Sequence, residues 1–371
     1  MKQNDVLFPA HQQPLQQILA ERTNSGYLYR QLDNDWIHCY ACGHNCTIKP
    51  DRFGVCRVRF NQNGELRVPW GYVGGLQVDP VEKKPFFHAL PGASTLSFGM
   101  LGCDFHCAYC QNWITSQTLR DPEAVALPKE ISSNQIIEIA LRHKAQIVTS
   151  TYNEPLISSE WAIEIFKLAR ANGLVTSYVS NGNGTPEVID HLQPWVDLYK
   201  VDLKSFQDRN YRKLGGVLQH VLDTIQMLWD QHFWVEIVTL IVPGFNDSNE
   251  ELKEIAEFLV AISPDIPWHV TAFHQDYKMT DPENTSVATL KQAVEIGQEA
   301  GLRYVYAGNL PGYVGNSENT YCFHCQSLLV ERRGFRVKQN RIQENLDASV
   351  CPDCQTKIAG VWGINQLEAL S

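Results

Sequence analysis

The cysteines of this chain fall into three groups, and the spacing of the central group suits redox chemistry. Cys103, Cys107 and Cys110 form a CxxxCxxC pattern in the loop GCDFHCAYCQNW. A structural zinc ion takes four protein ligands, so this loop alone is one ligand short. Three cysteines can instead hold three irons of a 4Fe-4S cluster and leave the fourth iron open. A zinc site completed by His106 or by a distant ligand is one alternative, and a redox pair of Cys107 and Cys110 is another.

The last four cysteines form two pairs, Cys322-x2-Cys325 and Cys351-x2-Cys354. Four thiolates in two such pairs are enough to close a tetrahedral zinc site. The segment SLLVERRGFRV between the pairs predicts a β-hairpin that the metal supports, because a tail of about 60 residues has little core of its own. We therefore predict structural zinc in a zinc-ribbon-like C-terminal module, with an auxiliary iron-sulfur cluster as the alternative.

The first four cysteines have an irregular spacing. They are Cys39, Cys42, Cys46 and Cys56. This pattern suits either a structural zinc ion or a second iron-sulfur cluster that relays electrons. His38 and His44 lie close enough in the sequence to replace one thiolate. Both metals therefore stay open for this N-terminal group.

Composition narrows the class of protein. The chain has 31 basic and 41 acidic side chains, a formal net charge of −10, and no long basic run. A nucleic-acid backbone or an anionic membrane surface is therefore not the expected main partner. The first 26 residues lack the apolar stretch of a signal peptide, and no segment approaches a membrane span of about 20 apolar residues. We expect a cytoplasmic protein, whose reduced thiols bind metals rather than form disulfides.

Short β-branched or aromatic runs alternate with helical stretches after Gly92, which is typical of repeated βα units. We predict strands near Thr95–Gly99, Gln146–Ser150, Val175–Val179, Leu198–Leu203, Val235–Val242, Trp268–Ala272 and Tyr304–Tyr306. Six or seven such units predict an α/β fold with a partial or near-complete parallel (β/α) barrel. The barrel is expected over residues 93–310, between a cysteine-rich N-terminal module (1–92) and the C-terminal module (311–371).

Candidate functional residues follow the predicted strands. Cys103 follows the first strand, Glu154 the second, Asn181 the third, Lys204 the fourth and His274 the sixth. Because the chemistry of a parallel barrel takes place at the C-terminal ends of its strands, we expect these side chains to converge on one site.

Several longer stretches carry a resemblance to a known family. They are DPVEKKPFFHALPG (79–92), the cysteine loop with QNW, TYNEP (151–155), EIVTLIVPGFND (236–247), HVTAFHQDYKM (269–279), YVYAGNLPG (304–312), and CFHC, ERRGF and CPDC in the tail. Together they extend from about Cys39 to Trp362. In this combination the chain resembles the radical S-adenosylmethionine (radical SAM) enzymes of the AmmeMemoRadiSam system, which are distantly similar to pyruvate formate-lyase activating enzyme.

This resemblance implies cofactors and a reaction. In radical SAM enzymes, the amino and carboxylate groups of SAM bind the open iron of a 4Fe-4S cluster. One electron from the reduced cluster breaks a carbon-sulfur bond of SAM, and the resulting 5′-deoxyadenosyl radical abstracts hydrogen from the substrate. The protein holds the reacting atoms in place and excludes water and oxygen.

The resemblance also implies a set of SAM contacts. Lys204 is expected to face the SAM carboxylate, Glu154 to accept hydrogen bonds from the SAM amino group, and Tyr109 to pack on adenine. The full set is Tyr109, Asn112, Thr151, Tyr152, Asn153, Glu154, Ser180, Asn181, Asp202, Lys204 and His274. For several of these residues an ordinary turn or a surface ion pair is the competing explanation.

Two departures from the family pattern are visible. Activating enzymes have a glycine pair before the Glu-Pro of the turn, where this chain has Tyr152 and Asn153, and a side chain there restricts close backbone approach. Activating enzymes also have an arginine near SAM on the strand where this chain carries Glu236 and Thr239. We expect His269 to be a core residue with a satisfied hydrogen bond.

Three functions remain open at this stage. The first is a radical SAM enzyme with an unidentified substrate, Memo-like and AMMECR-like partner proteins, and a flavodoxin or ferredoxin as electron donor. The second is an activase that makes a glycyl radical in a protein. The third is a zinc-ribbon scaffold or nucleic-acid-binding protein, which the acidic charge disfavours.

Overall fold

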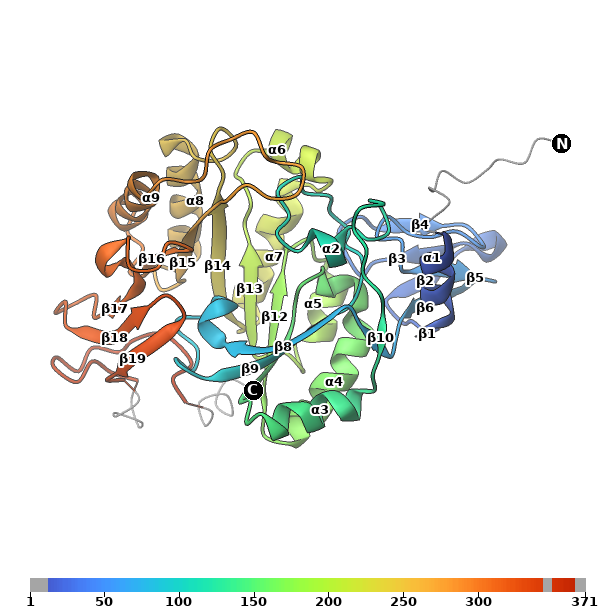
Figure 1. The fold of residues 1–371 in the computed structure, drawn as a ribbon, viewed down its shortest axis with the longest axis horizontal. Helices are drawn as coiled ribbons and strands as arrows, with labels where there is room; N and C mark the ends of the chain where they lie inside the picture. Colours follow the sequence, from blue (N-terminus) through green and yellow to red (C-terminus); the bar gives the residue numbers. More distant parts are fainter. Residues whose placement is uncertain (1–12, 343–348, 364–371) are drawn as a thin grey trace.

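The computed structural model describes residues 13–342 and 349–363, and an eight-stranded sheet forms its centre (Figure 1). Seven neighbouring strands are parallel and follow one another in chain order. An eighth strand, β8 (Gly75–Pro80), pairs antiparallel with β9 at one edge. The parallel strands are β9 (Ser94–Gly99), β11 (Ile147–Ser150), β12 (Val175–Ser180), β13 (Leu198–Asp202), β14 (Trp234–Ile241), β15 (Trp268–Ala272) and β16 (Val305–Gly308).

Helices connect the parallel strands. Right-handed crossovers between strands in sequential order place these helices on one face of the sheet. Their apolar stripes pack inward; in α7, for example, Val221, Ile225 and Leu228 are fully buried. The helices are α2 (Trp113–Ser116), α3 (Ser133–Arg142), α4 (Ser159–Ala171), α5 (Pro186–Leu192), α6 (Asp208–Leu214), α7 (Leu218–Asp230), α8 (Asn249–Ile262) and α9 (Val287–Glu299). Within the described ranges, no helix is long and apolar enough to cross a membrane.

The predicted α/β architecture is confirmed as a partial parallel barrel, and an observed strand overlaps each predicted one. In the part of the chain that the structure describes, no strand pairing joins β16 to β8, so the sheet stays open between these edges. We predicted Gly75–Pro80 as part of the N-terminal module (1–92), but this segment belongs to the large sheet as β8. The βα rhythm does not reveal this strand, because it precedes the first βα unit and is followed by a short 3-10 helix (Val81–Lys83) instead of an α-helix.

The face of the sheet opposite the helices carries the candidate site. Successive side chains of a strand point to opposite faces, so residues two apart share a face. Lys200 and Asp202 on β13 and His269 and Thr271 on β15 accordingly line the same cavity.

The N-terminal module packs against the barrel through short strands and one buried ion pair. Its elements are α1 (Gln13–Glu21), β1 (Thr23–Ser25), β2 (Tyr29–Gln31), β3 (Ile37–Cys39), β4 (Cys46–Ile48), β5 (Phe60–Gln62), β6 (Glu65–Pro69) and β7 (Tyr72–Val73). Two three-stranded sheets form, β2-β3-β4 and β1-β6-β5, and β7 pairs with β10 (Lys129–Glu130). Arg59 donates two hydrogen bonds of 2.7 Å to the Glu160 carboxylate of α4, which fixes the module to the barrel.

The C-terminal module contains β17 (Thr320–Tyr321), β18 (Leu328–Arg333) and β19 (Arg336–Asn340) in one antiparallel sheet. The hairpin predicted between the two cysteine pairs is therefore confirmed as β18–β19. A bridge between Ala89 and Val361 returns the tail to the segment that follows β8. Figure 1 shows the N-terminal strands and this hairpin at opposite ends of the large sheet.

Candidate active site

The CxxxCxxC loop follows β9 and is supported from behind by the N-terminal module. Gly102 has a φ of +91°, and a Cβ atom there would lie 3.1 Å from the carbonyl oxygen of Cys56. Both the left-handed backbone and this close approach require glycine. Arg120 donates hydrogen bonds of 2.6 Å to the carbonyl oxygens of Cys103 and Val55, which joins the loop to the segment that carries Cys56.

The three central thiols have the surroundings that an iron-sulfur cluster needs. The Sγ of Cys103 accepts a backbone N–H at 3.4 Å, and the Sγ of Cys110 lies 3.2 Å from the hydroxyl of Ser116. Burial raises the pKa of all three thiols, to about 12 for Cys107, where the Lys204 ammonium acts in the opposite direction. The thiols therefore keep their protons until a metal replaces them. Three buried cysteines, two of them with hydrogen-bond contacts at their sulfurs, fit a cluster with one open iron.

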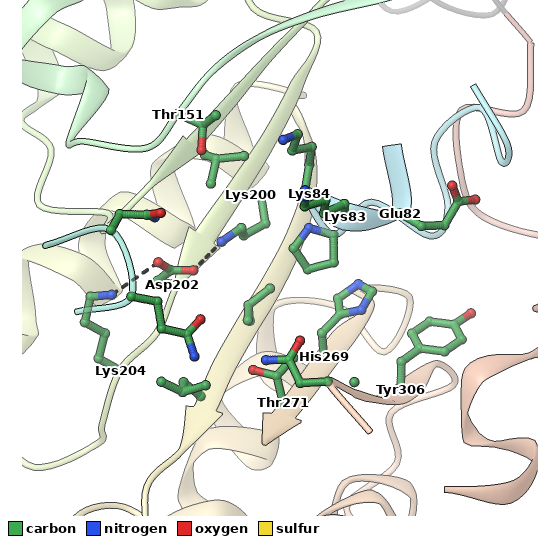
Figure 2. Close-up of a pocket in the computed structure, with 18 of the residues that line it drawn as sticks. Glu82, Lys83, Lys84, Thr151, Lys200, Asp202, Lys204, His269, Thr271 and Tyr306 are labelled. Atoms are coloured by element: carbon green, nitrogen blue, oxygen red, sulfur yellow. Dashed lines mark hydrogen bonds and ion pairs between the residues drawn. The ribbon is translucent and has the colours of Figure 1, made fainter. Parts of the chain in front are cut away.

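A cavity of about 400 Å³ opens beside this loop and is lined by Cys107 and Cys110. Its walls come from β13 to β16, from residues 82–87 after β8, and from Phe335 in the β18–β19 turn. Figure 2 shows Asp202 and Lys204 on one side of the cavity and Tyr306 on the other. Six predicted SAM contacts line it: Tyr109, Asn112, Thr151, Tyr152, Asp202 and Lys204. The structure thus brings these six residues together with two of the three loop cysteines.

The Asp202 carboxylate lies between two ammonium groups (Figure 2). Lys204 Nζ donates to its Oδ2 at 3.2 Å, and Lys200 Nζ donates to its Oδ1. Burial would raise the pKa of Asp202, but the two lysines outweigh it and lower the pKa to about 2. The Asp202 carboxylate therefore stays ionised, and its single negative charge is shared between the two ammonium groups.

Tyr152 stands where the resemblance to activating enzymes places a glycine, and its φ of +73° is a backbone conformation that favours glycine. The space for it comes from two other glycines. A Cβ on Gly99 would lie 2.2 Å from the carbonyl oxygen of Thr151, and a Cβ on Gly75 would lie 3.2 Å from the Tyr152 ring. Glycines on β8 and β9 thus make room for the backbone of Thr151 and the side chain of Tyr152.

Four other predicted contacts do not line the cavity and form a buried network behind the loop. Glu154 accepts hydrogen bonds from the Ser180 hydroxyl and the Asn181 N–H, each at 2.7 Å. The Asn181 side-chain amide donates to Asp104 at 2.7 Å, and the side-chain oxygen of Asn153 accepts the backbone N–H of Met100, directly after β9, at 3.0 Å. Burial and the nearby Asp104 carboxylate raise the pKa of Glu154 to about 8. These residues hold the ends of β9, β11 and β12 around the cysteine loop.

His269 on β15 and His274 just after it lie in different surroundings. His274 is exposed, its Nδ1 lies 3.2 Å from the Gln275 carbonyl oxygen, and it does not line the cavity. His269 is buried and satisfied, as expected, with Nε2 2.7 Å from Glu236, and it also lines the cavity. Glu236, in turn, accepts two backbone N–H groups at 2.9 Å from the segment after β8.

Three lysines that line the cavity, Lys83, Lys84 and Lys200, are not among the predicted contacts. Lys200 could have been found, because it lies two residues before Asp202 on a predicted strand and so shares its face. For Lys84 the sequence carries no comparable signal, since the tertiary packing of β8 against β9 brings it to the cavity.

The N-terminal cysteines touch the central loop but do not form a compact group. Cys39 and Cys46 are partners across β3 and β4, yet no three of the four sulfurs lie within 4.8 Å of one another. Cys42 instead forms a group of that size with His44 and Asp104. Because Asp104 directly follows a loop cysteine, this module reaches the candidate cluster site itself.

The four C-terminal sulfurs lie within 4.8 Å of one another. The distance is 3.6 Å between Cys322 and Cys354 and 3.6 Å between Cys325 and Cys351. A tetrahedral zinc ion with Zn–S bonds of about 2.3 Å holds its sulfurs about 3.8 Å apart. This set therefore fits a single zinc ion, in agreement with a zinc-ribbon-like module.

Comparison with known proteins agrees with this site. The sequence profile of the Radical SAM superfamily matches residues 99–259, which carry the central cysteines and β11 to β14. An uncharacterized protein of Methanocaldococcus jannaschii is 36% identical over 332 residues, which cover 89% of this chain and 97% of that protein. The chain belongs to the radical SAM superfamily. This membership implies an enzyme that uses SAM and a 4Fe-4S cluster.

Activating enzymes are more distant relatives of this radical SAM protein. Pyruvate formate-lyase 1-activating enzyme of Escherichia coli is 25% identical over 236 residues, which cover 58% of this chain and 93% of that enzyme. A solved domain of pyruvate-formate lyase-activating enzyme from Bacteroides vulgatus covers 44% of this chain and 98% of that domain, with 22% identity and a TM-score of 0.39.

Proposed function

We propose that this protein is a radical SAM enzyme whose substrate binds in the cavity beside Cys107 and Cys110. The observation that supports this most directly is that one cavity gathers these two cysteines with Asp202 and Lys204. Cys103, Cys107 and Cys110 would hold the 4Fe-4S cluster, which would supply the electron for reductive cleavage of SAM and so for hydrogen abstraction from the substrate. The residues of the chain bind SAM, place the substrate and exclude water.

We assign SAM recognition to the predicted contacts that line the cavity. Lys204 offers a positive charge to the SAM carboxylate; burial opposes that charge, but Asp202 outweighs it and raises the pKa of Lys204. Tyr109 is buried with its ring 5.6 Å from Phe245 and presents its remaining face to adenine. Asn112, Thr151 and Tyr152 supply polar groups. Asn153, Glu154, Ser180 and Asn181 act as positioning residues, and His274 receives no contact.

Anaerobic reconstitution with iron and sulfide, followed by dithionite and SAM, tests this assignment. We expect about four irons at the central site and release of 5′-deoxyadenosine. A triple variant, Cys103→Ala, Cys107→Ala and Cys110→Ala, should lose both, while its thermal unfolding is measured to confirm that it folds. Release of 5′-deoxyadenosine at the wild-type level from this variant would contradict the assignment of the cluster to these cysteines.

The substrate is not identified by these residues. On the shared motifs we propose that the protein acts in an AmmeMemoRadiSam system in the cytoplasm, with Memo-like and AMMECR-like partners and a flavodoxin or ferredoxin as electron donor. The alternative is a glycyl-radical activase, supported by the similarity to activating enzymes. Deuterium transfer separates the two: label from a protein glycine appears in 5′-deoxyadenosine only if the activase alternative holds.

We further propose metal centres in both flanking modules. Cys322, Cys325, Cys351 and Cys354 hold structural zinc, which their short sulfur-sulfur distances support. The N-terminal cysteines hold a second metal centre, zinc or an auxiliary iron-sulfur cluster. Their wider spacing and their contact with the central loop favour the cluster there.

A further inference from the structure

The wall of the active-site cavity carries more positive than negative groups. Four lysines line it: Lys83, Lys84, Lys200 and Lys204. Its two carboxylates are Asp202 and Glu82. Glu82 already lies 3.7 Å from the Arg332 guanidinium, and both side chains are fully buried. Its charge is therefore matched within the protein.

Each pair of lysines shares a single carboxylate. Asp79 accepts hydrogen bonds from Lys83 at 2.8 Å and from Lys84 at 3.0 Å. Asp202 likewise accepts hydrogen bonds from both Lys200 and Lys204. Two carboxylates thus face four ammonium groups, which leaves the wall with a surplus of two positive charges.

Lys200 combines the deepest burial of the four lysines with a single hydrogen-bond partner. An ammonium group has three N–H donors, and Asp202 is the one hydrogen-bond partner of Lys200 among the described residues. The Lys200 residue is only 4% exposed, and burial lowers the pKa of its ammonium group. Donors without partners in such a site are costly, so an acceptor that enters the cavity gains free energy.

Lys84 lies close to Lys200 and shares its surroundings. It is 5% exposed, and beyond Asp79 its further contact is the Tyr152 hydroxyl at 3.5 Å. The charge of Lys200 contributes to a lowered pKa of Lys84, after the larger effect of burial. Figure 2 shows both lysines between Thr151 and His269. An anion between them would relieve the repulsion of the two ammonium groups.

We propose that Lys200 and Lys84 bind an anionic group of the substrate, a carboxylate or a phosphate. SAM brings one carboxylate, which the proposed function assigns to Lys204, so the remaining positive charge calls for a second anion. The substrate class is then a small anionic molecule rather than a protein glycine, whose backbone carries no charge. This inference rests on the proposed function, because it concerns the same cavity.

Anion titrations of the reconstituted, SAM-bound protein without reductant test this inference. The probes are inorganic phosphate, followed by ³¹P NMR, and acetate, followed by ¹³C NMR, which distinguish the two anion types. We expect saturable binding of at least one probe. Lys200→Met and Lys84→Met should each weaken it by about tenfold, the loss of one charge-assisted hydrogen bond. Lys253→Met, which removes an exposed lysine of α8, should bind as the wild type does.

Two results would overturn the inference: no saturable binding of either probe to the wild type, or wild-type affinity in Lys200→Met. If Lys200→Met does not fold, the same criterion applies to Lys84→Met, and Lys200→Arg should retain binding because it keeps the charge. Release of 5′-deoxyadenosine is measured on the same preparations with dithionite. Release without anion binding contradicts only this inference, whereas anion binding without release contradicts the proposed function.

Discussion

The His88 imidazole is fully buried between the barrel and the C-terminal module. Its Nδ1 donates to the carbonyl oxygen of Ala359 at 2.7 Å, and its Nε2 accepts from the Tyr306 hydroxyl. One nitrogen that donates and one that accepts describe a neutral ring. Burial lowers the pKa of His88 from its ordinary value of 6.5 to about 4.

This pKa gives a pH dependence with a definite sign. Between pH 6.5 and about 4, the unfolded chain binds a proton at His88 and the folded chain does not, so stability is lost as the pH falls through this range. His88→Gln should flatten that part of the stability curve, measured by urea unfolding at several pH values. His143→Gln, at an exposed position, is the matched control. Equal slopes for His88→Gln and the wild type would contradict the prediction.

Between elements, the Arg59–Glu160 pair joins the N-terminal module to α4. Both side chains are almost completely excluded from solvent, and two hydrogen bonds of 2.7 Å connect them. Burial alone would raise the pKa of Glu160. The charge and hydrogen bonds of the Arg59 guanidinium outweigh this effect and hold the pKa below its ordinary value. Such a pair fixes two segments about one hundred residues apart, but each charge depends on the other.

Arg59→Met should destabilise the protein by about 3–5 kcal/mol, because it leaves a buried carboxylate without its partner. The double variant Arg59→Met, Glu160→Leu should regain much of that loss, since no charge then remains. Arg212→Met breaks an exposed pair with Asp208 and should cost less than about 1 kcal/mol. Thermal and denaturant unfolding measure all three. An equal cost for the two single variants would refute the argument.

The elements of the barrel were predictable, because each parallel strand is a short apolar run followed by a helical pattern. The position of β8 was not, because its pairing with β9 depends on contacts between segments rather than on local sequence. The cysteine groups were likewise evident from spacing. The sequence could not predict whether Glu154 faces SAM or the protein interior, because its partners Ser180 and Asn181 lie at the end of another strand, β12.

At the scale of the whole molecule, the net charge of −10 contrasts with the lysines of the cavity. A concave site of one sign within a surface of the other sign concentrates the field at its mouth. The four lysines thus give the cavity a charge opposite in sign to the net charge of the chain.

The C-terminal module contributes to both the core and the cavity. Cys322 and Cys351 are buried in one hydrophobic cluster with Tyr304 and Tyr306 of the barrel, and Phe335 lines the cavity. We expect the full-length protein to contain about one zinc ion in this module and Cys351→Ser to lose it. Elemental analysis measures the metal, and hydrogen exchange should show faster exchange in β16 of the variant. Iron with visible sulfide charge-transfer bands in this module would contradict the zinc assignment.

The Cys56 segment packs closely against Gly102, so the N-terminal module covers the cysteine loop from behind. Dioxygen that approaches the loop from this side meets packed backbone and the bridging Arg120. A methyl group at Gly102 would lie only 3.1 Å from the Cys56 carbonyl oxygen, so the packing there is tight. Loosening the N-terminal module should therefore expose a cluster held by this loop to dioxygen from that side.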